Sequence, residues 1–129
     1  EYTIKVDCDV LTAEGGTRCA SITGACVALH DACTWLSEKT GQPSPFGRLV
    51  AAVSVGTVAG EQRLDLAYLE DRDAEVDANV VMLAPHDFVE VQGTGEHGTF
   101  DRAALDRLLD LAQGGMNEPF ALQRTALGL

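Results

Sequence analysis

Residues 15–21, Gly-Gly-Thr-Arg-Cys-Ala-Ser, are of the types that could bind an anion. They stand at the start of a long helical pattern, and a helix N-terminus presents backbone N–H groups that have no partner within the helix. The helix macrodipole adds about half a positive charge at that end. Glycines allow an anion to approach the backbone, and the guanidinium of Arg18 can bind two of its oxygens. The segment therefore predicts a phosphate site.

An ordinary strand-to-helix turn with a solvated Arg18 is the alternative that these residues leave open. The spacing matches neither a Walker A loop, which needs Gly-Lys followed by Ser or Thr, nor the Gly-x-Gly-x-x-Gly motif. Nucleophilic catalysis has no support, because no Ser or Cys is paired with a His in the sequence pattern.

A stretch of acidic residues is the second group that could do chemistry. Its members are Glu70, Asp71, Asp73, Glu75 and Asp77. Mg²⁺ binds oxygen ligands of this kind, usually one or two carboxylates together with substrate phosphates. An EF-hand loop counted from Asp71 fails, because its sixth position is Val76 and its twelfth is Met82. A solvated acidic turn is the competing interpretation.

Length and charge limit the classes of function. The 129 residues are enough for one domain with its own core, so we expect a single domain over residues 1–129. With 20 acidic and 9 basic residues, a formal net charge of -11 argues against nucleic-acid binding by this chain alone. No apolar run or signal-peptide pattern indicates a membrane protein, so we expect a cytoplasmic location and no membrane partner. The chain begins with Glu, and we expect it to be a piece of a longer protein.

The cysteines predict no metal site. No Cys-x-x-Cys pair occurs, and Cys19, Cys26 and Cys33 recur every seven residues, which places them near one face of one helix. We expect these three and Cys8 to be small buried side chains with reduced thiols.

The hydrophobic pattern predicts the elements that position these residues. Alternation over residues 2–10 predicts a strand, and residues 17–36 have helical spacing. Further strands are expected at residues 49–58, 63–69, 76–83 and 88–92, with a flexible loop at 93–98. Asp101 is a candidate N-cap for a helix that stops at Gly114 and Gly115, and Pro119 is expected in the first turn of a last short helix. The fold class is therefore α+β, a mostly antiparallel sheet covered by two main helices.

Several motifs together resemble the second half of the bacterial ribonuclease PH family. They occur, in the family's order, at residues 9–11, 15–18, 21–25, 27–29, 50–56, 64–68, 70–71, 74–79, 88–94 and 109–112. The Gly-Gly-Thr-Arg segment and the Glu-Val-Gln-Gly-Thr segment are the most specific of these. The resemblance implies the ribosomal protein S5 domain 2-like fold, as a fragment of a larger fold.

The resemblance implies a phosphorolytic 3′-to-5′ exoribonuclease, a nucleotidyltransferase that trims tRNA precursors and uses inorganic phosphate. Its phosphate-binding residues correspond to Gly16, Thr17 and Arg18, with Ser21 close by. Its catalytic aspartates correspond to Asp71 and Asp77. Asp77 is assigned as general acid or metal ligand, Asp71 is its partner on the metal side, and Mg²⁺ is the expected ion.

The family's first half, which carries further arginines and most RNA contacts, has no counterpart in this sequence. The resemblance also implies a ring of six built from dimers. We therefore expect the chain alone to be inactive, and its partners to be structured RNA 3′ ends, phosphate and the N-terminal half. A non-catalytic scaffold or interaction subunit of a related exosome-like ring is the alternative.

Overall fold

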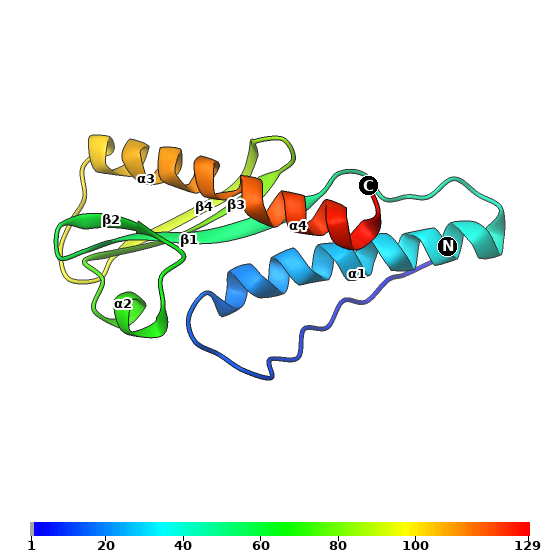
Figure 1. Ribbon diagram of the computed structural model, residues 1–129, viewed down its shortest axis with the longest axis horizontal. Coiled ribbons are helices and arrows are strands. Elements are labelled where there is room, and N and C mark those ends of the chain that lie inside the picture. The colour runs from blue at the N-terminus through cyan, green and yellow to red at the C-terminus, as the bar shows by residue number, and fades with distance from the viewer. Residues whose placement is uncertain (1) are drawn as a thin grey trace.

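The computed structural model describes residues 2–129 as one sheet with helices packed against it (Figure 1). None of the helices in this range is long and apolar enough to cross a bilayer. The elements in chain order are α1 (Thr17–Thr40), β1 (Val50–Val58), β2 (Glu61–Leu64), α2 (Tyr68–Arg72), β3 (Val76–Leu83), β4 (Asp87–Gly95), α3 (Arg102–Gly115) and α4 (Asn117–Leu127).

The sheet is antiparallel throughout, in the order β2-β1-β3-β4. The Val-rich strand β1 is central and buried on both faces, as its continuous apolar run predicts. One face packs against α3 and α4, where residues such as Val55 and Val80 meet Leu108 and Phe120. The predicted α+β class and antiparallel sheet are confirmed, and the interval predicted for β3 is the one observed.

Helix α1 lies against the part of β1 that β2 leaves unpaired. β2 pairs with β1 only along Val55–Val58. Upstream of this, the Thr23 hydroxyl accepts from the Ala52 N–H (3.1 Å) and donates to the Ala52 carbonyl (3.5 Å). Gln123 of α4 donates to carbonyls of both α1 and β1. Cys19, Cys26 and Cys33 are buried on this side of α1, as their spacing predicts. The expected burial of Cys8 is wrong, because it lies in the exposed segment that precedes α1.

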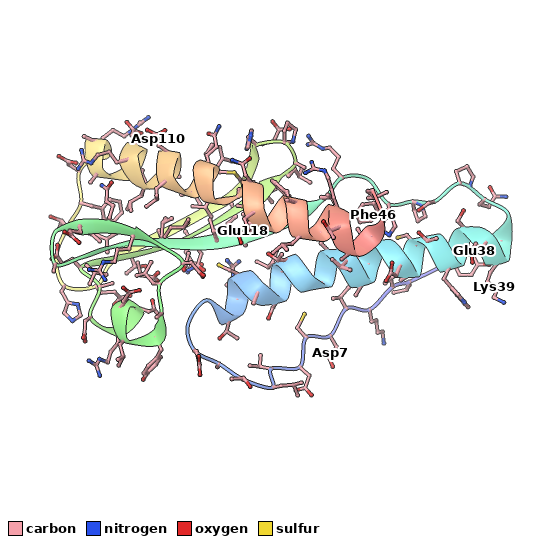
Figure 2. The ribbon with its side chains drawn as sticks, viewed as in Figure 1. Asp7, Glu38, Lys39, Phe46, Asp110 and Glu118 are labelled. Carbon is pink, nitrogen blue, oxygen red and sulfur yellow. The ribbon has the colours of Figure 1, made fainter. Side chains whose placement is uncertain are left out.

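Helix α3 begins and ends where the sequence predicts, and α4 begins where it predicts. The Asp101 carboxylate accepts from the Ala104 N–H at 2.7 Å, which confirms it as the N-cap of α3. The helix ends at Gly115, and Pro119 stands in the first turn of α4. Acidic residues are spread over the exposed surface, as Asp7, Asp110 and Glu118 illustrate (Figure 2).

The strand predicted at residues 2–10 is wrong. This segment is exposed and runs alongside α1 (Figure 1), and no strand forms in it. Its contact with α1 is through side chains, such as Cys8 Sγ with the Ser21 carbonyl at 3.8 Å. A strand needs a neighbouring edge for its backbone groups, and alternation of side chains does not supply one.

The strand predicted at residues 63–69 is also wrong in its second part. β2 ends at Leu64 because Asp65 takes a positive φ of 57°, and the chain then forms α2. The loop predicted at residues 93–98 is wrong in its first part. Strand β4 continues through Gly95, which pairs with Val76 of β3.

Candidate active site

A cavity of about 410 Å³ lies where the N-terminus of α1, α2 and the sheet meet. Its lining residues are Ala13, Gly15, Gly16, Thr17, Arg18, Ser54, Tyr68, Asp71, Asp77 and Asn79. Five residues predicted as site residues from the sequence are therefore brought together. They are Gly16, Thr17, Arg18, Asp71 and Asp77.

The sheet face under the cavity follows from the strand register. Asp77 of β3 stands between Gly56 of β1 and Thr94 of β4, and two residues along β3 Asn79 stands between Ser54 and Gln92. Residues two apart on a strand share a face. Period-two spacing thus directs Asp77 and Asn79 to the same side, opposite the face covered by α3 and α4.

The N-terminus of α1 is open to an acceptor from outside the helix. Its N-cap, Gly16, is left-handed with φ 58°, no side chain caps the first turn, and no acidic residue lies in that turn. Ser21 is not among the lining residues, because it lies one turn further along, where its Oγ donates to the Thr17 carbonyl at 2.9 Å. The free N–H groups are those that bind anions at helix N-termini.

Gly15 allows the loop before α1 to touch the chain that leads into α2. Its φ is +99°, and a Cβ there would lie 2.5 Å from the Leu66 carbonyl oxygen and 2.9 Å from the Tyr68 nitrogen. The Tyr68 N–H donates to the Glu14 carbonyl at 3.0 Å. Glycine at this position thus sets the distance between the predicted phosphate site and α2, which carries Asp71.

Arg18 is held by a carboxylate from the edge strand. Its Nη2 lies 2.9 Å from both carboxylate oxygens of Glu90 on β4, with both side chains nearly half exposed. Only Nη2 takes part in this pair, and among residues 2–129 no acceptor engages Nη1 or Nε, which remain for a ligand. An exposed pair of this kind contributes at most about 1 kcal/mol to stability, and its effect is to fix the direction of the guanidinium.

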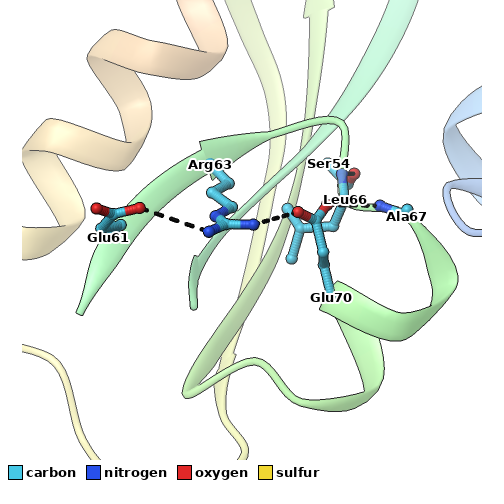
Figure 3. A network of polar contacts seen from close by, with 6 residues as sticks. All are labelled: Ser54, Glu61, Arg63, Leu66, Ala67 and Glu70. Atoms are coloured by element: carbon cyan, nitrogen blue, oxygen red, sulfur yellow. Dashed lines mark hydrogen bonds and ion pairs between the residues drawn. The ribbon is translucent and has the colours of Figure 1, made fainter. Parts of the chain in front are cut away.

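Asp71 is positioned by the network that caps α2 (Figure 3). Glu70 accepts from the Ala67 N–H at 3.1 Å and pairs with Arg63, which also contacts Glu61. These two contacts, the backbone hydrogen bond first, lower the pKa of Glu70. Glu70 therefore has a structural role, and Asp71, the next residue, faces the cavity.

The rest of the acidic stretch points elsewhere. Asp73 forms an ion pair with Arg72, which lowers its pKa, and Glu75 accepts from the Gly60 N–H. Only Asp71 and Asp77 of the five acidic residues line the cavity. Within residues 2–129, no group of three or more His, Cys, Asp or Glu side chains is arranged to hold a metal.

Asp77 is a carboxyl that binds its proton more tightly than usual. Burial raises its pKa most, the nearby charges of Asp71 and Glu96 raise it further, and a hydrogen bond from the Ala78 N–H opposes them. A carboxyl with a raised pKa beside a second carboxylate suits proton transfer, and the pair also offers oxygen ligands for a cation.

Sequence reasoning missed four residues that contribute to the site: Ser54, Tyr68, Asn79 and Glu90. For Asn79 the signal was present, because alternation within residues 76–83 places it on the same face as Asp77. The pairing of Glu90 with Arg18 depends on the register between β3 and β4, which the sequence pattern does not specify.

Comparison with known proteins identifies relatives of the whole chain. A family model described as the 3′ exoribonuclease family, domain 2, matches residues 48–115. The chain is 56% identical over 131 residues to ribonuclease PH of Nocardia farcinica and 55% identical over 129 residues to that of Mycolicibacterium smegmatis. These alignments cover 100% and 98% of the chain but 51% and 50% of those proteins. The chain thus spans about half the length of the curated relatives it matches.

Solved structures share the fold at low identity. Rice (Oryza sativa) Rrp46 superposes with a TM-score of 0.67 at 18% identity, covering 90% of this chain and 50% of that one. An archaeal exosome core structure gives a TM-score of 0.68 at 19% identity, covering 90% of this chain and 47% of that one. At this level of identity, the similarity to these structures concerns the fold alone.

Proposed function

Since the chain belongs to the 3′ exoribonuclease family and carries its second domain, we propose that it supplies the active site of a phosphorolytic 3′-to-5′ exoribonuclease. The enzyme would be a nucleotidyltransferase of the ribonuclease PH type. One observation carries the proposal: a single cavity joins an uncapped helix N-terminus and Arg18 to the carboxyls of Asp71 and Asp77. Phosphoryl transfer requires this combination of positioning and charge.

In the proposed reaction, an oxygen of inorganic phosphate attacks the phosphorus of the last phosphodiester. The bond from that phosphorus to the 3′ oxygen of the preceding nucleotide breaks, and the last nucleotide leaves as a nucleoside diphosphate. The N–H groups of the first turn of α1, including those of Thr17 and Arg18, orient the attacking phosphate and offset its charge. Asp77, with its raised pKa, would protonate the leaving 3′ oxygen.

Asp71 and Asp77 fit a magnesium site. They are two carboxylates in one cavity beside a phosphate site, which is the set Mg²⁺ commonly uses. Burial raises the pKa of Asp77 most, and a cation would offset the charge of Asp71, which raises it further. When bound, Mg²⁺ would neutralise charge that develops on the phosphates. Asp71 would then bind the ion throughout the reaction. Asp77 would either bind the same ion or carry the proton for the leaving oxygen.

We place the main contacts with RNA outside this chain. Its net charge is -11, and five arginines are engaged in ion pairs with carboxylates: Arg18, Arg48, Arg63, Arg72 and Arg102. Binding of tRNA precursors or other structured RNA 3′ ends would therefore rely on the half of the relatives' length that this chain does not cover. Assembly into a ring of six and a cytoplasmic location belong to the same proposal.

The test uses the intact protein and a tRNA with extra 3′ residues. Nucleoside diphosphate should be released only when inorganic phosphate is present. Arg18→Ala should raise the KM for phosphate about tenfold or more, because it removes a charged donor. Arg102→Ala, at an exposed ion pair on α3, is the matched control and should leave that KM unchanged. An intact protein that binds RNA but releases no nucleotide would instead be the non-catalytic subunit of an exosome-like ring.

A further inference from the structure

Asn79 is a polar residue of the candidate active site to which the proposed reaction assigns no role. It lines the cavity together with Arg18 and Asp77, and it lies on the same face of β3 as Asp77, roughly 6.6 Å further along the strand. An amide side chain at such a position offers either a carbonyl oxygen or an N–H₂ group to a ligand. Which of the two groups faces the ligand depends on the protein atom that binds the other one.

The thiol of Cys19 fixes the orientation of the Asn79 side-chain amide. Its Sγ lies 2.9 Å from Asn79 Oδ1, and since an amide oxygen only accepts, the thiol must be the donor. A thiol donates only when protonated, and burial raises the pKa of Cys19 to about 11 despite the opposing charge of Arg18. The thiol therefore keeps its proton at neutral pH, and the amide oxygen of Asn79 is turned toward α1.

The other end of the amide is left for a ligand. Within residues 2–129, Asn79 Nδ2 donates to no protein atom, and the cross-strand neighbour Ser54 uses its Oγ to accept from the Leu66 N–H at 3.0 Å. The cavity also contains Arg18 and the free N–H groups of α1, which favour an anion, and the carboxyls of Asp71 and Asp77, which favour a proton or a cation. An N–H₂ group has no acceptor to offer a cation, so its partner in this cavity is the anion.

We propose that Asn79 Nδ2 donates a hydrogen bond to an oxygen of the inorganic phosphate, and that Cys19 is the positioning residue that orients the amide. This inference rests on the proposed phosphorolytic function and adds a third kind of donor to the helix N-terminus and Arg18. It also gives Cys19 a role that a buried thiol such as Cys33 does not have.

The direct test is the KM for inorganic phosphate, measured on the intact protein at saturating RNA. Asn79→Ala removes the donor and should raise this KM about tenfold or more, with a smaller effect on the KM for RNA. Asn79→Asp keeps the shape, replaces the donor with a negative acceptor and should raise it further. Asn117→Asp, at the start of α4, is the matched control and should change neither constant.

The second test addresses Cys19. Cys19→Ala removes the donor that orients the amide and should raise the KM for phosphate several-fold, whereas Cys19→Ser retains an O–H donor and should restore it. Cys33→Ala removes another buried thiol of α1 and should leave the KM unchanged. A structural role of Cys19 alone would move the urea midpoint of both Cys19 variants without this difference in KM.

Two outcomes separate the inference from the function on which it depends. If Arg18→Ala raises the KM for phosphate while Asn79→Ala does not, the role of Asn79 is overturned and the proposed function stands. If Arg18→Ala also has no effect, the proposed phosphate site itself is wrong.

Discussion

Replacement of Gly15 by alanine should disrupt the candidate site without removing any reacting group. Gly15 has a φ of +99°, and its Cα approaches the chain at Leu66 and Tyr68 so closely that a Cβ would lie 2.5 Å from the Leu66 carbonyl oxygen. The obstacle is backbone, which no rotamer change can move. The N-terminus of α1 and the turn into α2 must separate, and Asp71 moves away from Arg18.

The magnitude follows from two effects. A non-glycine residue at positive φ costs about 1–2 kcal/mol. Forcing atoms into a filled space typically costs a further 1–3 kcal/mol or so. We therefore expect Gly15→Ala to lower the free energy of unfolding by about 2–5 kcal/mol. Gly60→Ala is the matched control, because Gly60 has a φ of +77° but no atom within 4 Å of the added Cβ, and it should incur only the first effect.

Urea unfolding and phosphorolysis of the intact protein would measure both consequences. Gly15→Ala should have the lower urea midpoint of the two variants and should lose at least about tenfold in kcat/KM for phosphate, while Gly60→Ala keeps its activity. The reasoning is refuted if Gly15→Ala unfolds at the same urea concentration as Gly60→Ala and retains the wild-type kcat/KM.

Two further changes test the charges and the capping. The folded state binds the proton of Asp77 more tightly than the unfolded state, so the stability contributed by that proton is present below the usual carboxyl pKa and is lost as pH rises through the raised value. Asp77→Asn should therefore be more stable than wild type at pH 7 without divalent cations, by an amount that shrinks toward pH 4, and it should be inactive; equal urea midpoints at pH 7 would contradict this. Asp101→Ala should destabilise the protein by about 1 kcal/mol, because Ala104 N–H loses its acceptor at the start of α3, and phosphorolysis below the melting temperature should not change; an unaltered midpoint would count against the cap.

Local patterns predicted much of the fold because they report burial. The alternation in residues 76–83 and the apolar run of β1 each reflect a face that must be covered, and Asp101 satisfies N–H groups that any helix leaves free. The segment at residues 2–10 has the same alternation, yet it forms no strand. Its pattern describes two faces of side chains and carries no information on which edge pairs with its backbone.

The parts of the site that belong to short sequence motifs could be predicted from the sequence. Arg18 stands out by its place at a glycine-rich helix start, and the resemblance to the ribonuclease PH family selects Asp71 and Asp77 from the acidic stretch. The structure brings all three into one cavity. The pairing of Arg18 with Glu90 depends on register between strands, and that of Cys19 with Asn79 depends on how α1 lies on the sheet. Both are tertiary relations between residues about 60 or more positions apart, and neither has a local signature.

Transfer of radiolabelled inorganic phosphate into product tests the central claim most directly. With the intact protein and a tRNA carrying extra 3′ residues, the label should appear in the terminal phosphate of the released nucleoside diphosphates, and Arg18→Ala should greatly reduce its incorporation. Release of unlabelled nucleoside monophosphates at a rate independent of phosphate would contradict the account, since water and not phosphate would then be the nucleophile.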